Sequence, residues 1–234
     1  MTEQEYRLSP GINKSTLWEM RKSPAHYKYA LENPPKETPA LLLGRAIHAA
    51  ILTPESYKDE YVVAPDVDRR TNEGKEVYGQ FIADHLDKTI LSRDDNVLVM
   101  EIAAAVQADE AAAMLLSGCE TEKPIFWTDV ATGLMCKCRV DAKKLDGMTV
   151  IDLKTCADAS PSAFVRDAIK YGYDVQAAHY IRGVRSINGG RPVSWYFIAV
   201  EKTPPYAVNV IKASDAFLDR GTWQLMGLMN KLNE

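Results

Sequence analysis

Cysteine is scarce in this chain of 234 residues, which contains four, and their positions argue against the common cysteine-based cofactor sites. The four are Cys119, Cys136, Cys138 and Cys156. Their spacing does not match a zinc site, and no run typical of an iron–sulfur cluster is present. Cys136 and Cys138 alternate along an expected strand, on the face opposite Asp141, so we expect reduced structural thiols.

Long hydrophobic runs and a basic excess are also missing. The first seven residues are polar, unlike a signal peptide, and no segment approaches the length of a membrane span. We therefore expect a cytoplasmic protein with no membrane partner. The formal net charge of −4 lacks the basic excess that usually marks nucleic-acid binding, so contacts with DNA would have to come from local patches.

The composition, with 46% hydrophobic and 26% charged residues, is ordinary for a soluble globular protein. We expect residues 1–234 to form a single domain with an α-β-α order of elements. Helices are expected at residues 12–31 with a break near Ser23-Pro24, then at 40–52, up to about 85 after a polar loop at 66–74, at 96–116, from 161, and at 174–186 and 214–232. Strands are expected at residues 61–63, 122–129, 193–200 and 207–211, besides the hairpin that follows.

Residues 138–155 are the most informative stretch, and their pattern predicts a β-hairpin. Asp146-Gly147 between two strand-like runs favours a two-residue turn, because Gly tolerates positive φ freely and Asp tolerates it fairly well. Counting outward from this turn gives the pairs Leu145–Met148, Asp141–Asp152 and Arg139–Lys154. The two carboxylates should then lie roughly 5 Å apart at Cβ, on one face of the hairpin.

Two like charges that face each other across a sheet are destabilising unless something compensates them. Mg²⁺ is the natural compensation, with Mn²⁺ as an alternative, because hard divalent cations prefer carboxylate oxygens. Lys154 shares the face of Asp152, where an ammonium can orient a water or neutralise charge on a phosphoryl oxygen. For Asp-x-Lys alone, ordinary surface charges are the commoner explanation. The second aspartate in register favours the metal site.

Asp141 together with Asp152-Leu153-Lys154 resembles the core of the PD-(D/E)XK nucleases, although Val140 stands in place of the proline. Further motifs follow in the order seen in the exodeoxyribonuclease VIII (RecE-type) nuclease domains. They are Ser23-Pro24-Ala25-His26-Tyr27, Leu43-Gly44-Arg45-Ala46-Ile47-His48, Arg69-Arg70-Thr71-Asn72-Glu73-Gly74-Lys75 and Gln176-Ala177-Ala178-His179-Tyr180. The resemblance covers residues 8–232. It implies an α/β fold of the restriction-endonuclease type, with a mixed central sheet flanked by helices.

The resemblance also assigns roles to individual residues. Asp141, Asp152 and His48 match the metal-binding positions, and Lys154 matches the catalytic lysine. Gln176 and Tyr180 match a motif on the following helix, where i, i+4 spacing puts them on one face with access to the scissile region. A packed helix histidine and a surface Gln–Tyr pair remain the plain alternatives. Glu101 and Glu122 are acids that could join the metal shell, but solvated glutamates are commoner.

The implied activity is that of a bacterial or prophage exonuclease, which degrades the 5′-ended strand of linear double-stranded DNA in homologous recombination. Two-metal hydrolysis would leave a 5′ phosphate. Arg69, Arg70 and Lys75 are candidates to bind DNA phosphates, against the alternative of a disordered basic loop. Members of this family act as homo-oligomeric rings around DNA, so a ring such as a tetramer is expected. A single-strand annealing protein would be a partner in the same process.

Three other functions are compatible with these residues. A non-catalytic DNA-binding protein could retain a nuclease-like fold, although intact Asp141, Asp152 and Lys154 argue against it. A RecB-type or CRISPR-associated nuclease of different polarity is a second alternative, and several of those branches carry an iron–sulfur cluster. A small-molecule enzyme with a Mg²⁺ site is the third and weakest.

Overall fold

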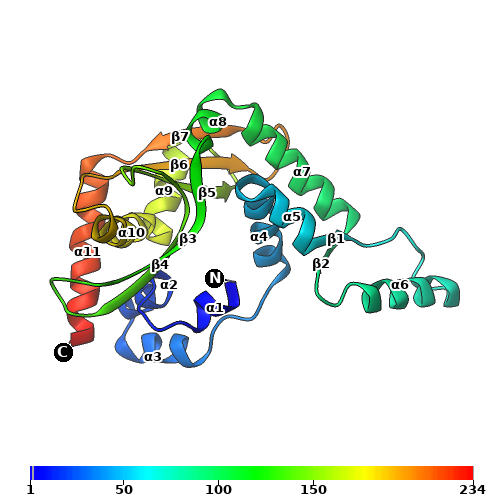
Figure 1. The fold of residues 1–234 in the computed structure, drawn as a ribbon, viewed down its shortest axis with the longest axis horizontal. Coiled ribbons are helices and arrows are strands. Elements are labelled where there is room, and N and C mark those ends of the chain that lie inside the picture. Colours follow the sequence, from blue (N-terminus) through cyan, green and yellow to red (C-terminus); the bar gives the residue numbers. More distant parts are fainter. Residues whose placement is uncertain (2, 234) are drawn as a thin grey trace.

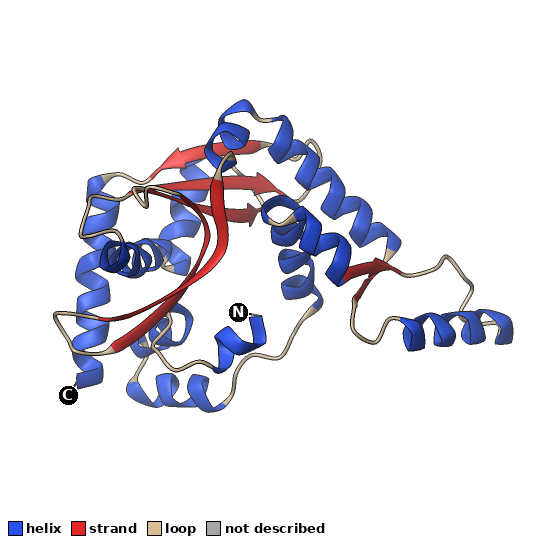
Figure 2. Ribbon diagram, in the orientation of Figure 1, coloured by secondary structure: helices blue, strands red, loops and turns tan. Residues whose placement is uncertain are grey.

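A mixed sheet of five strands forms the centre of the molecule (Figures 1 and 2). The computed structural model describes residue 1 and residues 3–233, and within this part the strands follow the order β3-β4-β5-β6-β7. Their bounds are Cys119–Thr128, Met135–Lys144, Thr149–Cys156, Ser194–Glu201 and Val208–Lys212. Only β5 and β6 pair in parallel within this sheet, because two helices connect them. The predicted mixed sheet flanked by helices is confirmed.

One face of the sheet is covered by helices from the start and from the last third of the chain. They are α2 (Lys14–Leu17), the 3-10 helix η1 (Trp18–Arg21), α9 (Pro161–Tyr171), α10 (Tyr173–Ile187) and α11 (Asp215–Asn233). Val150, Trp195 and Phe197 point into this layer and are buried, as are Cys136 and Cys138. The two cysteines are free thiols, so the expectation of small core cysteines is confirmed.

The opposite face packs against helices from the first half of the chain. They are α4 (Pro39–Leu52), α5 (Pro54–Glu60), α7 (Arg93–Ala108) and α8 (Glu110–Leu116). Ile151, Leu153 and Ile198 alternate with the residues of the first layer and are fully buried here. Both faces of β5 and β6 are therefore apolar, which is typical of parallel strands.

An arm made of residues 61–91 projects from this body (Figure 1). Its base is the parallel pair β1 (Tyr61–Val63) and β2 (Thr89–Leu91), and its outer part is α6 (Asn72–Asp84). The remaining helices, α1 (Glu3–Leu8) and α3 (Pro24–Glu32), lie below the long β3–β4 hairpin in the view of Figure 1. No helix among the described residues is both long and apolar enough to cross a membrane.

The expected helix at residues 96–116 is two helices, and the first expected helix is broken more often than proline alone predicts. Asp109 ends α7 and caps α8, because its Oδ1 accepts a hydrogen bond of 2.8 Å from the amide of Ala112. Asn13 caps α2, and Ser23 caps α3. Helix α5 was not predicted; it begins at Pro54, shortly after the expected helix at residues 40–52, because proline is favoured in the first turn of a helix.

A buried histidine on α10 makes the stability of this fold pH-dependent. Nε2 of His179 donates to the carbonyl of Lys137 at 3.2 Å, and burial lowers the pKa of the imidazole to about 4 from 6.5. Between these values the unfolded chain binds a proton that the folded protein excludes, so stability falls as pH falls. We expect His179→Gln to reduce the loss of unfolding free energy between pH 7.5 and 4.5 by about 2–3 kcal/mol.

Urea unfolding at both pH values measures this difference. His26→Gln, which changes an exposed histidine on α3, is the matched control and should keep the pH dependence of the wild type. An unchanged pH dependence in His179→Gln would contradict the prediction.

Candidate metal centre

The β4–β5 hairpin has the predicted register but a different turn. Ala142 pairs with Ile151 and Lys143 with Val150, as counting from the turn predicted. The predicted two-residue turn is wrong, since the amide of Gly147 donates to Lys144 O and only Gly147 has positive φ. The Asp146 side chain instead accepts from the amide of Met148 at 2.8 Å. The four-residue connection therefore preserves the register.

The pairing of β4 with β5 ends just before the two aspartates. Neither Asp141–Asp152 nor Arg139–Lys154 is a ladder pair, which corrects the extrapolated register. Val140 packs in the layer of α10 and Ala142 in the layer of α4, although residues two apart on a regular strand share a face. Strand β4 therefore bends at Asp141 and leaves β5 there.

The Asp141 side chain takes over the missing ladder contact. Its Oδ2 accepts a hydrogen bond of 2.9 Å from the amide of Leu153, and the same oxygen lies 3.7 Å from Nδ1 of His48. His48 comes from α4, whose apolar residues Ala46 and Ile47 fix the helix against the sheet. The expected proximity of His48 to the aspartates is thus present.

Glu122 completes a cluster with His48 and Asp141. One ligand atom of each of the three residues lies within 4.8 Å of the other two, and all three side chains are partly buried. Oε2 of Glu122 lies 2.8 Å from Nε of Arg139, which balances its charge. Glu122 has a φ of 51°, a conformation that costs energy in a residue other than glycine and is found at functional sites.

A solvated Glu122 was expected because solvated glutamates are commoner than metal-bound ones, and the sequence alone gives no register of β3 on β4. In the structure, Thr121 pairs with Ala142 and Lys123 with Val140, so Glu122 lies across from Asp141. Residues 129–134, which connect the two strands, carry no two-residue turn motif from which this register could be counted. Glu101, the other acid considered, is exposed on α7 and contacts Tyr206.

Asp152 lies beside this cluster and is 1% exposed. Its Oδ2 is 2.5 Å from Nζ of Lys154, and its Oδ1 accepts a hydrogen bond of 2.6 Å from Nε2 of Gln176 on α10. Gln176 therefore contacts the site, and the alternative of a surface Gln–Tyr pair does not hold for this residue. Tyr180, one turn later, is half-buried and packs edge-on against Trp195, with ring centres 5.9 Å apart.

Burial and mutual charge set the protonation states of these groups. Burial raises the pKa of Asp152 to about 6, although the Lys154 ammonium opposes the shift, and burial also raises the pKa of Asp141. Burial opposes the charge on Lys154, but both carboxylates outweigh it and raise the pKa of that ammonium. Burial and Lys154 lower the pKa of His48 to about 4. At pH 7 the imidazole is neutral and Asp152 is mostly ionised.

These side chains suit a hard divalent cation. A neutral imidazole and ionised carboxylates are the forms that bind metals. His48, Glu122 and Asp141 converge within ligand distance of one another, and Asp152 adds a buried carboxylate next to them. Carboxylate oxygens with one imidazole favour Mg²⁺ or Mn²⁺ over soft metals. Cys136 and Cys138 do not contribute, since they pack in the layer on the other side of β4.

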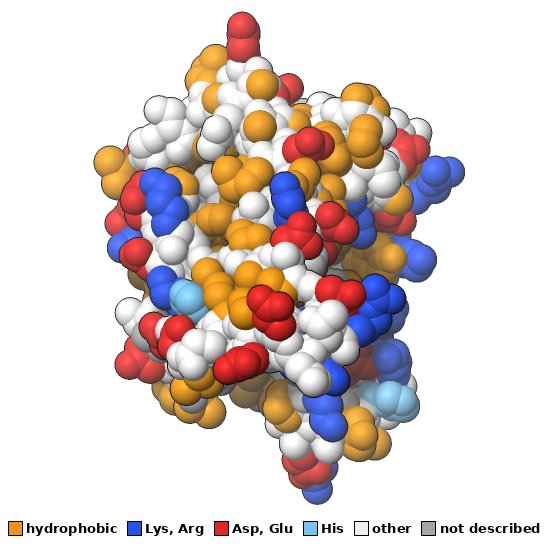
Figure 3. All heavy atoms as spheres, turned by 90° about the vertical axis from the view of Figure 1, so that its right-hand side faces the viewer, with side chains coloured by type: hydrophobic (Ala, Val, Ile, Leu, Met, Phe, Trp, Pro, Cys, Tyr) orange, Lys and Arg blue, Asp and Glu red, His pale blue; other side chains and the backbone are white. Residues whose placement is uncertain are grey.

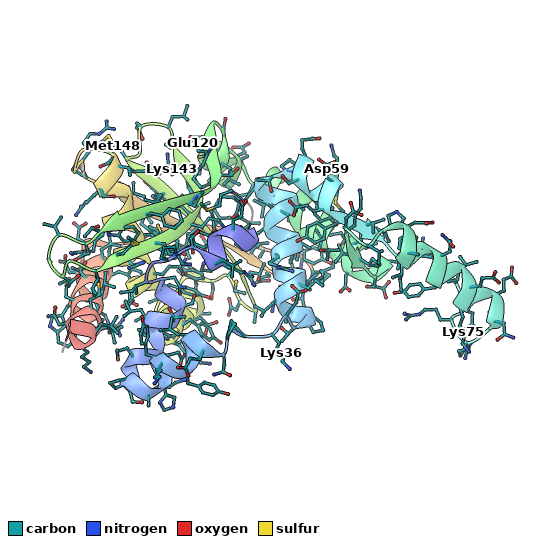
Figure 4. All side chains as sticks on the ribbon, turned by 60° about the horizontal axis from the view of Figure 1, so that its bottom comes forward. Lys36, Asp59, Lys75, Glu120, Lys143 and Met148 are labelled. Atoms are coloured by element: carbon teal, nitrogen blue, oxygen red, sulfur yellow. The ribbon has the colours of Figure 1, made fainter. Side chains whose placement is uncertain are left out.

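The basic residues predicted to bind DNA lie on the arm. Figure 4 shows Lys75 near the outer end of the arm, far from Glu120 and Lys143 on the sheet. Arg70 forms an ion pair of 2.9 Å with Asp68, and Arg69 lies over the ring of Tyr78 at 4.7 Å. Acidic and basic side chains are interspersed on the face that the arm presents (Figure 3). The structure thus separates these three residues from the metal cluster.

Glu122→Gln should weaken the affinity for Mn²⁺ by about 10- to 100-fold, the range seen when groups around a metal are changed. The substitution keeps the size of the side chain but removes the charge that faces His48 and Asp141. Isothermal titration calorimetry with Mn²⁺ measures the effect, and Glu101→Gln is the matched control. Equal affinities of the two variants would exclude Glu122 from the metal shell.

Comparison with known proteins identifies the family of this site. Residues 14–234 match the family described as a PDDEXK-like domain of unknown function (DUF3799), and the chain belongs to this family. No curated protein matches the sequence. The recognition of the PD-(D/E)XK superfamily is thereby confirmed, whereas the closer resemblance to RecE-type domains remains a prediction.

A solved structure shares the fold at low sequence identity. A crystal structure from Eubacterium rectale, named "Putative exonuclease", is 16% identical, with a TM-score of 0.63 over 99% of this chain and 87% of that chain. The structure of SSO0001 is 14% identical over 98% of this chain and 88% of that chain, and its TM-score of 0.32 is below the level that indicates a shared fold. At such identities, the likeness to the E. rectale protein supports the fold alone.

Proposed function

We propose that this protein is a metal-dependent exonuclease that degrades the 5′-ended strand of linear double-stranded DNA, within homologous recombination. The observation that carries the proposal is the convergence of Asp141, Asp152 and Lys154 with His48 and Glu122 where β4 leaves β5. Membership of a PDDEXK-like family supports hydrolysis of phosphodiesters. The name of the E. rectale structure is consistent with an exonuclease, and the polarity rests on the RecE-type motifs.

Each side chain has a role that follows from its position. A divalent cation bound by His48, Glu122, Asp141 and Asp152 would supply Lewis-acid activation of the attacking water and the phosphate, and two-metal use is part of the proposal. Lys154 orients the water and neutralises charge that builds on the phosphoryl oxygens. Gln176 holds Asp152 in place through its hydrogen bond of 2.6 Å.

The balanced reaction adds the water oxygen to phosphorus and breaks the bond from phosphorus to the 3′ oxygen. The shortened strand then carries the new 5′ phosphate, and the released terminal nucleotide leaves with a 3′ hydroxyl, whose oxygen has taken up a proton. Tyr180 lies one turn after Gln176 and keeps its phenol protonated, because burial raises its pKa well above the ordinary value. It can therefore donate a hydrogen bond to substrate.

The arm is the second part of the proposed substrate site. Arg69, Arg70 and Lys75 would contact the phosphate backbone at a distance from the cluster, without reading sequence. Arg70 would have to exchange Asp68 for phosphate, since the two form an ion pair. Assembly into a ring, with a tetramer as one form, and cooperation with an annealing protein belong to the same proposal.

Digestion of linear duplex DNA labelled separately at its 5′ and 3′ ends tests the function. Wild type and Asp152→Ala are compared with Mg²⁺ or with EDTA. Early Mg²⁺-dependent release of the 5′ label by wild type alone is the expected result. Release of the 3′ label first would reverse the polarity and favour a RecB-type nuclease, and binding without cutting would favour a non-catalytic DNA-binding protein.

A further inference from the structure

A pocket of about 180 Å³ lies next to Lys154, apart from the cluster of His48, Glu122 and Asp141. Residues of β5, α9, the start of α10 and the segment after β6 line it. The charged and aromatic side chains that line the pocket are Lys154, Phe164, Asp167, Tyr171, Tyr173 and Lys202. Pockets for drug-sized ligands span roughly 300–1,000 Å³, so this pocket suits a single ring system.

Three aromatic rings form a supported wall in this pocket. The centres of the Tyr171 and Tyr173 rings are 5.9 Å apart, and Phe164 backs Tyr173 at 6.2 Å. Phe164 is 2% exposed, whereas Tyr171 is 47% exposed. The wall therefore has a buried inner ring and a partly exposed outer ring, with the Lys170 ammonium 5.2 Å from the centre of the Tyr171 ring. A nucleobase can stack on this outer ring, with the mobile Lys170 side chain displaced, without moving the core.

The aromatic wall lies next to Lys154, the proposed catalytic residue, and two further lysines lie around it. Nζ of Lys154 lies 4.9 Å from the centre of the Tyr173 ring. The amide of Lys202 donates to the carbonyl of Cys156 at 3.2 Å, so the segment that carries the Lys202 ammonium is tied to the end of β5. Lys14 donates to the carbonyl of Tyr171 at 2.7 Å and fixes the end of α9.

We propose that this pocket is a nucleotide subsite. The base adjacent to the scissile phosphate stacks on the Tyr171 ring, and the Lys202 ammonium faces a phosphate. The inference rests on the proposed nuclease function and adds to it a site for one nucleotide. Stacking on an aromatic ring accepts every base, which agrees with sequence-independent digestion. Asp167, the carboxylate among the described lining residues, disfavours a second phosphate and can accept a hydrogen bond from a base.

Cleavage of matched substrates tests the stacking. One duplex carries a normal 5′-terminal nucleotide, and the other carries an abasic residue there. We expect wild type and Tyr171→Phe to cleave the abasic end about 10-fold more slowly, mainly through KM, and Tyr171→Ala to cleave both ends at a similar low rate. Tyr29→Ala, which removes an exposed tyrosine on α3, should behave as wild type. A preference for the base that survives in Tyr171→Ala would overturn the proposal.

Binding without turnover separates this proposal from the nuclease function. Deoxyadenosine monophosphate and deoxyribose 5-phosphate are titrated in EDTA and followed by NMR. We expect tighter binding of the nucleotide, a loss of this difference in Tyr171→Ala, and weaker binding of both compounds to Lys202→Ala. Base-dependent binding by a protein that cuts no DNA would support the pocket and refute the nuclease. Cleavage by a wild type that does not distinguish the two compounds would refute the pocket alone.

Discussion

Lys154→Met is expected to slow phosphodiester cleavage by roughly 10²–10⁴-fold, the range for a group that moves protons or stabilises developing charge. The ammonium is held 2.5 Å from Asp152 and over the Tyr173 ring, so it is fixed where the water and phosphate would react. Methionine keeps most of the length of the side chain but has no charge. Because the substitution removes the counter-ion of Asp152, Mn²⁺ binding should be retained or become tighter. Single-turnover cleavage and calorimetry measure the two effects.

A folding control accompanies this variant, since it leaves Asp152 buried without its partner. Burial already raises the pKa of Asp152 to about 6, and the loss of Lys154 should raise it further. A folded pKa above the unfolded value means that stability falls as pH rises through this range. The loss of unfolding free energy in Lys154→Met should therefore be larger at pH 8 than at pH 6. Lys231→Met on the exposed side of α11 is the matched control, and cleavage at the wild-type rate by Lys154→Met would refute the assigned role.

Asp152→Asn should also slow cleavage, by a factor on the order of 10³ or more. Its effect on Mn²⁺ binding should differ from that of Lys154→Met. Asparagine keeps the shape of the side chain and can still accept the hydrogen bond from Gln176. It removes the buried negative charge that the metal and Lys154 share, so Mn²⁺ binding should weaken, in contrast to Lys154→Met. The same cleavage and calorimetric measurements, with Asp219→Asn as the matched control, test this contrast.

Equal Mn²⁺ affinity in Asp152→Asn and wild type would mean that Asp152 acts only through Lys154. Cleavage by Asp152→Asn at the wild-type rate would instead show that Asp152 has no role in the reaction. Thermal unfolding of both proteins shows whether the variant is folded when the assays are made.

The centre of the site could be predicted because local rules determine it. The register at Ala142–Ile151 follows from the position of the turn, although the turn itself differs, since a four-residue connection and a two-residue turn can give the same pairing. The motif on α10 follows from helical spacing, and the contact from Gln176 to Asp152 agrees with it.

The features of the site that could not be predicted from the sequence depend on contacts between residues far apart in the chain. Glu122 is brought to the site by the β3–β4 register and by a positive φ, and neither has a local signature. The end of the β4–β5 pairing at Asp141 depends on how β4 bends between two helical layers. The distance of Lys75 from the cluster depends on the arm, whose paired ends lie 28 residues apart in sequence, as in Val63–Leu91.

The hydrogen bond from the Leu153 amide to Asp141 means that one carboxylate serves two purposes. It completes the sheet in place of a carbonyl, and it belongs to the cluster that suits a cation. An alanine at position 141 would remove both functions together, whereas an asparagine would leave an oxygen for the amide. The backbone amide of Leu153 is thus a spectroscopic reporter built into the strand, since any change in the charge on Asp141 alters the electric field at that one proton.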